Sequence, residues 1–161
     1  MKSLPTRRHA VAALAILPVL ACAAPARAAS APKIVVTKDP NCGCCAAWVD
    51  HLKAAGFMAE MVETPRVNAV KARLGVPPEL ASCHTAEVGR YVIEGHVPAS
   101  AIARLLREQP AAKGLAVPGM PLGSPGMEVE GSPPDTYDVI LFGAFGQRRF
   151  ARFQGATELP E

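Results

Sequence analysis

The chain has 161 residues, of which 19% are charged, with 17 Lys and Arg against 14 Asp and Glu. Four of the basic residues lie within residues 1–28, so residues 29–161 carry 13 basic and 14 acidic side chains, a net charge of −1. This balance argues against nucleic acid and against an anionic membrane surface as partners, and the length suits one domain.

Residues 1–28 have the three parts of a secretory signal. A basic start is followed by an apolar run over residues 10–21 and by Ala26-Arg27-Ala28, which fits the small-x-small cleavage rule. The run is shorter than the roughly 20 residues of a transmembrane helix, so we expect no integral membrane segment after cleavage. We therefore predict a periplasmic protein. Lipoprotein anchoring at Cys22 is the alternative, and Leu20 argues against it.

The apolar pattern of residues 33–108 predicts the element order β-α-β-α-β-β-α. β-Branched residues predict a strand over 33–37, and helical periodicity predicts a helix over 44–55. The elements expected next are a strand over 57–62, a helix over 65–74, a hairpin of strands 86–88 and 91–93, and a helix opened by Pro98.

Residues 109–161 differ in composition. Gly and Pro are frequent over 111–135, which predicts a loop, and strands 137–142 and 147–153 can pair as an added hairpin. We therefore expect one α/β domain over 29–161, with its core at 33–108 and a loop-and-hairpin extension at 109–161.

The element order, with Cys42-x-x-Cys45 between the first strand and the first helix, resembles the thioredoxin fold. In that fold the segment before the third strand packs against the redox loop, which implies that Cys83 and His84 lie beside residues 42–45. Two features depart from the pattern: Asn41 stands where a Trp is usual, and no proline stands at Cys83-His84-Thr85, where that fold usually has one.

Cys42, Cys44 and Cys45 begin the first predicted helix, where backbone amides and the helix dipole favour thiolates. Thiols this close in sequence close only tiny loops, so they would stabilise the fold poorly as disulfides. Cu(I) accepts two or three sulfur ligands, whereas structural zinc usually takes two separated pairs of ligands. The sequence therefore favours copper, as Cu(I), over zinc.

Other candidate ligands lie further along the chain. Cys83 and His84 are adjacent, and the expected fold places both near the first three cysteines. Met120 and Met127 lie in a Gly- and Pro-rich segment, residues 117–128, which we call the methionine loop. Two interpretations of these methionines are open: soft-metal ligands, or side chains that fill gaps in the packing.

Four side chains are expected to have other roles. We expect His51 to face solvent and His96 to be structural. We expect Met58 and Met61 to pack on an apolar face of the second strand.

Several motifs together resemble the CopG-type family of small periplasmic metal-binding proteins linked to copper resistance. They are Asp39-Pro40 before Cys42-Gly43-Cys44-Cys45, then Cys83-His84, Gly95-His96-Val97-Pro98 and the methionine loop. The resemblance implies a thioredoxin-like fold and copper bound at the Cys-x-Cys-Cys motif, with interconversion of Cu(I) and Cu(II) as a further expectation. Carried over by position, the ligands centre on Cys42, Cys44, Cys45 and Cys83, with His84, Met120 and Met127 as additional candidates.

Three functions remain open at this stage. The first is an exported copper-binding protein for copper resistance, acting with other periplasmic copper-handling proteins; whether it turns over as a copper oxidoreductase is undecided. The second is a periplasmic thiol–disulfide oxidoreductase using Cys42 and Cys45. The third is a structural domain held by disulfides.

Overall fold

The structure is a computed structural model that describes residues 32–160. The predicted signal over residues 1–28, with Cys22, lies outside the described residues. Within residues 32–160, no helix is both long enough and apolar enough to cross a membrane.

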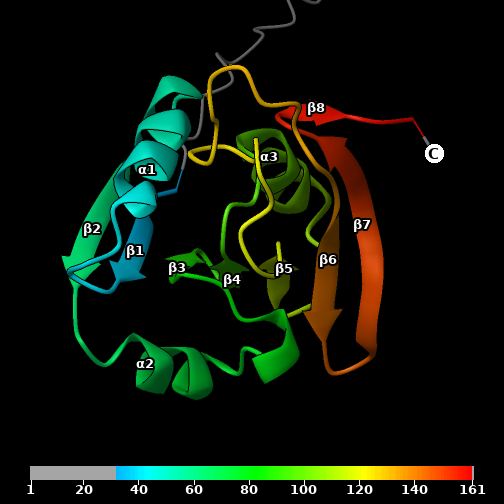
Figure 1. Ribbon diagram of the computed structural model, residues 1–161. Helices are drawn as coiled ribbons and strands as arrows, with labels where there is room; N and C mark the ends of the chain where they lie inside the picture. Colours follow the sequence, from blue (N-terminus) through cyan, green and yellow to red (C-terminus); the bar gives the residue numbers. More distant parts are fainter. Residues whose placement is uncertain (1–31, 161) are drawn as a thin grey trace, which may run out of the picture.

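One mixed sheet of eight strands runs through the molecule (Figure 1). Its strands are β1 Ile34–Lys38, β2 Ala59–Glu63, β3 His84–Val88, β4 Tyr91–Glu94, β5 Gly114–Ala116, β6 Thr136–Gly143, β7 Gly146–Gln154 and β8 Thr157–Glu158. They lie in the order β2-β1-β3-β4-β5-β6-β7-β8. The pairs β1–β2 and β4–β5 are parallel, and the other neighbours are antiparallel.

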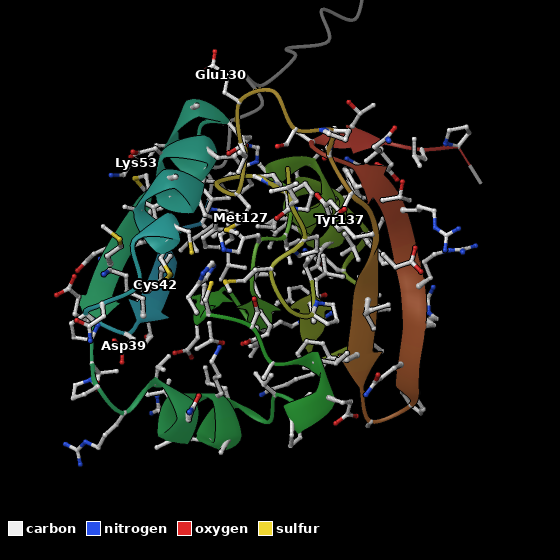
Figure 2. All side chains as sticks on the ribbon, viewed as in Figure 1. Asp39, Cys42, Lys53, Met127, Glu130 and Tyr137 are labelled. Atoms are coloured by element: carbon white, nitrogen blue, oxygen red, sulfur yellow. A yellow bond between two sulfur atoms is a disulfide. The ribbon has the colours of Figure 1, made fainter. Side chains whose placement is uncertain are left out.

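The helices are α1 Cys44–Ala54, α2 Val67–Leu74 and α3 Ala99–Glu108, and a short 3-10 helix, η1, spans Pro78–Leu80. The turn between β1 and α1 contains Asp39 and Cys42 (Figure 2). The Asp39 side chain accepts a hydrogen bond from the Asn41 amide at 2.9 Å, and the Cys42 amide donates to the Asp39 carbonyl at 3.0 Å. These local bonds fix the turn that carries the first cysteine.

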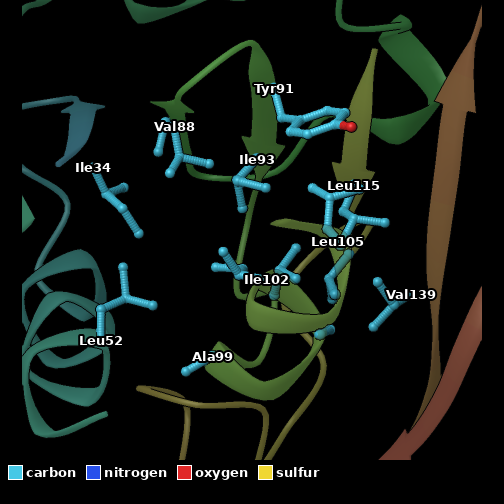
Figure 3. Packing of buried hydrophobic residues seen from close by; sticks show 14 of the residues in the cluster. Ile34, Leu52, Val88, Tyr91, Ile93, Ala99, Ile102, Leu105, Leu115 and Val139 are labelled. Carbon is cyan, nitrogen blue, oxygen red and sulfur yellow. The ribbon is translucent and has the colours of Figure 1, made fainter. Parts of the chain in front are cut away.

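The helices cover both faces of the sheet. The larger core contains Leu52 of α1 and Ile102 of α3, packed on one face of the strands (Figure 3). A second core, on the opposite face, contains Leu74 of α2. Successive side chains of a strand point to opposite faces of the sheet, so one strand contributes to both cores. In β4, Ile93 belongs to the first core and its neighbour Val92 to the second.

The mixed α/β class predicted from the sequence is confirmed, and so is the hairpin formed by β6 and β7. Strand β5 was not predicted, because it is three residues long and lies inside the Gly- and Pro-rich segment. The expectation that Met58 and Met61 are packed is wrong: they are 56% and 40% exposed. Strand β2 is an edge strand in which no side chain is fully buried, which explains the error.

Candidate metal-binding site

The first helix begins directly at the cysteines. Gly43 is the N-cap of α1 and provides no side-chain capping bond, and the first turn has no acidic residue. The first amides of α1 therefore have no carboxylate to meet their partial positive charge. A thiolate at Cys42 or Cys44 would be stabilised there.

Four sulfur atoms converge beside this helix end. Cys83 directly precedes β3, which pairs with β1, so it reaches the turn from which α1 starts. Its Sγ lies 4.0 Å from that of Cys44 and 3.8 Å from that of Cys45, and the Sγ atoms of Cys42 and Cys44 are 3.6 Å apart. All four lie within 4.8 Å of one another. We call Cys42, Cys44, Cys45 and Cys83 the sulfur cluster.

Two members of the sulfur cluster form a disulfide. Cys42 is bonded to Cys45, whereas Cys44 and Cys83 are free thiols and are half-buried. A disulfide sulfur cannot act as a thiolate ligand, so this state offers two thiols. Reduction by two electrons would raise the number to four.

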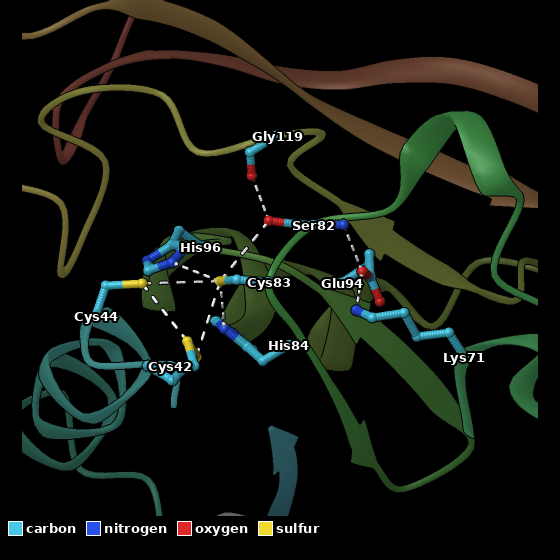
Figure 4. A network of polar contacts seen from close by, with 10 residues as sticks. Cys42, Cys44, Lys71, Ser82, Cys83, His84, Glu94, His96 and Gly119 are labelled. Atoms are coloured by element: carbon cyan, nitrogen blue, oxygen red, sulfur yellow. Dashed lines mark hydrogen bonds and ion pairs between the residues drawn. A yellow bond between two sulfur atoms is a disulfide. The ribbon is translucent and has the colours of Figure 1, made fainter. Parts of the chain in front are cut away.

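Two histidines extend the cluster (Figure 4). His84 Nδ1 lies 3.2 Å, and His96 Nε2 3.1 Å, from Cys83 Sγ, and both rings are fully buried. His96 Nδ1 lies 2.7 Å from the carbonyl oxygen of Pro125, which can only accept a hydrogen bond. Nδ1 therefore carries the ring proton, and the lone pair of Nε2 faces Cys83. Among the described residues, His84 Nε2 has no hydrogen-bond partner.

Burial controls the protonation of His84, His96 and Cys83. It lowers the pKa of His84 well below its ordinary value, with smaller effects from His96 and Lys71 in the same direction. It also lowers the pKa of His96. Burial, with Cys44 nearby, raises the pKa of Cys83 to about 11. The site therefore presents neutral imidazoles, which are the metal-binding form, beside a thiol whose proton a soft metal ion would displace.

A buried ion pair supports the segment before β3. Lys71 of α2 bonds to Glu94 of β4, and both side chains are almost completely buried. The same Glu94 oxygen accepts a hydrogen bond from the Ser82 amide at 2.7 Å. Burial raises the pKa of Glu94, and the charge of Lys71 opposes this. The pair thus anchors the residue next to Cys83.

The methionine loop closes over the site from another side. Gly126 has φ +87°, and a Cβ there would lie 2.6 Å from the amide nitrogen of Trp48 in α1, so this close approach requires glycine. Met127 is half-buried in the loop beside α1 (Figure 2). Met120 is 53% exposed, and the preceding Gly119 accepts a hydrogen bond from the Ser82 hydroxyl.

The structure thus brings together the predicted residues Cys42, Cys44, Cys45, Cys83 and His84. The two methionines lie in the loop that closes the site, and their role as ligands stays a prediction.

The contacts of two histidines were not predicted. His96 was expected to be structural; it is fully buried and bonded to the Pro125 carbonyl, and it also contacts Cys83, because the β3–β4 hairpin returns the chain to the start of β3. Its place in the motif Gly95-His96-Val97-Pro98 was the signal that could have found it. His51 was expected to face solvent, but it is half-buried and its Nε2 accepts a hydrogen bond from the Ala99 amide at 3.1 Å.

Comparison with known proteins agrees with this arrangement. A family model described as "Protein of unknown function, DUF411" matches residues 80–127, a span that includes Cys83, His84 and His96. The solved structure "Copper resistance protein copG- Form 1" is 44% identical, with a TM-score of 0.72, and the match covers 78% of this chain and 99% of that one. "Copper resistance protein copG- Form 2" is 43% identical, with a TM-score of 0.69 and coverage of 81% and 99%. No curated protein matches.

Proposed function

Because this chain belongs to the CopG copper-resistance family, we propose that it is an exported copper-binding protein that holds Cu(I) at the sulfur cluster. The observation that carries the proposal is the convergence of four Sγ atoms within 4.8 Å, with two buried imidazoles in contact with Cys83. The link to copper resistance comes from the two similar solved structures, which are copper resistance proteins.

The donor set fits this metal. Thiolate sulfur and imidazole nitrogen are the ligands that suit Cu(I), and carboxylate oxygens, which suit Mg²⁺ or Ca²⁺, are absent from both metal-competent groups of residues 32–160. Zinc also accepts sulfur and nitrogen in a tetrahedral arrangement, and the sulfur–sulfur distances of 3.6–4.0 Å would fit it. The preference for Cu(I) therefore rests on the spacing in sequence, where adjacent Cys44 and Cys45 suit Cu(I) ions that share bridging thiolates, and on the copper-resistance relatives.

We assign ligand roles by distance. The proposed ligands are the four thiolates of the reduced sulfur cluster together with His84 and His96. Met120 and Met127 are proposed as outer thioether ligands, since the methionine loop contacts the site through Pro125 and Gly119.

Export to the periplasm is proposed on the signal pattern of residues 1–28.

We also propose that residues 33–108 form a thioredoxin-like core. The order β2-β1-β3-β4, with β3 antiparallel to its neighbours and with α1 and α3 on one face, supports this assignment. The redox pair of such a fold, Cys42 and Cys45, would then be an electron source for copper. Oxidation of this dithiol to a disulfide releases two electrons and two protons, enough to reduce two Cu(II) ions to Cu(I), and it leaves Cys44 and Cys83 as the thiols of the cluster until the disulfide is reduced again.

Titration under anaerobic conditions tests copper binding. The protein is first reduced, and Cu(I) is then added against a coloured competing chelator. We expect binding tighter than micromolar, lost in the variant that carries Cys42→Ser, Cys44→Ser and Cys45→Ser, and retained in Met58→Leu, whose exposed thioether lies just before β2. Binding weaker than micromolar, or equal in the cysteine variant, would refute the proposal.

A second function has one observation in its favour. The Cys42–Cys45 disulfide at the start of α1 suits a thiol–disulfide oxidoreductase. Rapid reduction of insulin disulfides by the metal-free, reduced protein, lost in Cys42→Ser, would support this function. Insulin reduction no faster than with free dithiol would exclude it.

A further inference from the structure

The turn between β6 and β7 presents a phenylalanine to solvent. Gly143 pairs with Gly146, so Ala144 and Phe145 form the end of the hairpin, and Phe145 is 90% exposed. This turn lies away from the start of α1, where the cysteines are (Figure 1). A single exposed apolar side chain is ordinary by itself, so the surroundings of Phe145 decide what it means.

The turn is held against the segment before β5. The Lys113 amide donates a hydrogen bond to the Phe142 carbonyl at 2.8 Å. A Cβ at Gly143 would lie 2.8 Å from the same amide nitrogen, so the hairpin approaches this segment closely. Phe145 is therefore presented from a fixed backbone, and binding to it costs less conformational entropy than binding to a free loop.

Three hollows in the described part of the chain adjoin this turn. The first has a volume of about 260 Å³ and is lined by Phe145 and Arg148, with apolar residues between them. The second, of about 330 Å³, is lined by Arg73 and Lys113, and the third, of about 310 Å³, by Arg90 and Lys113. No acidic residue lines any of the three. We call Phe145 with these four cations the basic tip.

The chain itself leaves the charge of the basic tip unneutralised. All four cations are exposed, and within residues 32–160 none of them forms an ion pair. Arg90 is held by backbone carbonyls instead, at 2.8 Å from that of Gln109 and 3.1 Å from that of Pro110. The carboxylate of Glu79 accepts a hydrogen bond from the Gln147 amide group at 2.6 Å, so it does not pair with a cation of the tip.

We propose that the basic tip is a docking surface for an acidic segment of a partner protein, a segment that carries a large apolar side chain beside its carboxylates. The carboxylates pair with the free cations, and the apolar side chain enters a hollow next to Phe145. Complementary charge speeds association and selects the partner, and aromatic and Arg side chains often dominate the binding energy of interfaces. The surface shares no residue with the sulfur cluster, so the inference goes beyond the proposed copper function and does not depend on it.

An anionic membrane suits the basic tip less well than a protein does. The hollows beside Phe145 have room for side chains, and a lipid surface offers none to fill them. Residues 29–161 also carry 13 basic and 14 acidic side chains, a net charge of −1, which gives the whole molecule no attraction to anionic lipid.

The test uses a display library of random peptides, selected on the immobilised, metal-free, full mature chain. We expect the enriched peptides to be rich in Asp and Glu and to contain Leu, Phe or Trp. A fluorescent copy of the most enriched peptide then gives the dissociation constant by anisotropy. Phe145→Ser should weaken binding about tenfold or more, and so should the double variant Lys113→Glu with Arg148→Glu.

Two substitutions outside the basic tip are the matched controls. Val129→Ser removes another exposed apolar side chain, and Lys53→Glu reverses another exposed charge, on α1. Neither residue lines the three hollows, so both variants should bind the peptide as wild type does.

A selection that enriches no peptide, or enriches peptides without an excess of acidic residues, would overturn the inference. Equal binding by wild type and the tip variants would do the same, and if one tip variant fails to fold, the other decides. Sedimentation with phosphatidylglycerol vesicles that is lost in Phe145→Ser would assign the tip to a membrane instead. Self-association lost in that variant, measured by ultracentrifugation, would assign it to a second copy. Because no copper is present, failure of the proposed copper function would leave these results unaffected.

Discussion

Replacement of Gly126 by alanine is expected to push the methionine loop away from α1. The new Cβ would lie 2.6 Å from the backbone nitrogen and 3.1 Å from the Cα of Trp48, atoms that cannot move without disturbing the helix. A non-glycine residue at φ +87° adds about 1–2 kcal/mol of strain. With about 1–3 kcal/mol for the overpacked contact, we expect a loss of about 2–5 kcal/mol in the free energy of unfolding.

The same change should weaken metal binding, because Pro125 orients His96 from the adjacent position. Loss of a partner that orients a metal-ligating histidine typically lowers affinity by about 10–100-fold. Urea unfolding gives the stability, and chelator competition gives the Cu(I) affinity of the reduced protein. Gly131→Ala is the matched control, because Gly131 also has positive φ but nothing lies within 4 Å of the position that its new methyl group would take. Equal losses in the two variants would refute the steric argument.

Three other substitutions probe the site and its support. Cys83→Ser should lower the number of copper ions bound per chain, as measured by metal analysis, and an unchanged stoichiometry would show that Cys83 is not a ligand. Lys71→Met should lower the free energy of unfolding at pH 7 by about 3–5 kcal/mol, because it leaves the Glu94 carboxylate buried without its partner; urea unfolding that gives a loss below about 1 kcal/mol would contradict this. Burial lowers the pKa of His51 in the folded state, so its contribution to stability is complete above pH about 6.5 and is lost as the pH falls below that value. His51→Gln should therefore flatten the stability curve between about pH 7 and pH 5, and a curve parallel to wild type would contradict this.

The sequence predicted the elements whose burial pattern is regular. Strand β1 and helix α1 were expected within a residue or two, because β-branched content and helical periodicity are local signals. The position of Cys83 beside the first three cysteines was also expected, but only from the resemblance to a known fold, since 38 residues separate it from Cys45.

Features that depend on the whole fold could not be predicted in this way. The contact between His96 and Cys83 depends on the register of the β3–β4 hairpin, which a motif does not specify. The pairing of Cys42 with Cys45, with Cys44 left free, depends on the geometry of one turn. The exposure of Met58 and Met61 depends on β2 lying at the edge of the sheet, and an apolar strand pattern does not reveal which strand is outermost.

The residues proposed as ligands come from separate parts of the chain: the turn before α1, the start of β3, the segment after β4, and the loop that contacts His96 through Pro125. No short stretch of the chain contains more than three of the sulfur donors. The proposed coordination sphere would therefore exist only after β1, β3 and β4 have paired. A chain exported in an unfolded state would cross the membrane without its assembled site, and its metal loading would have to follow folding on the far side.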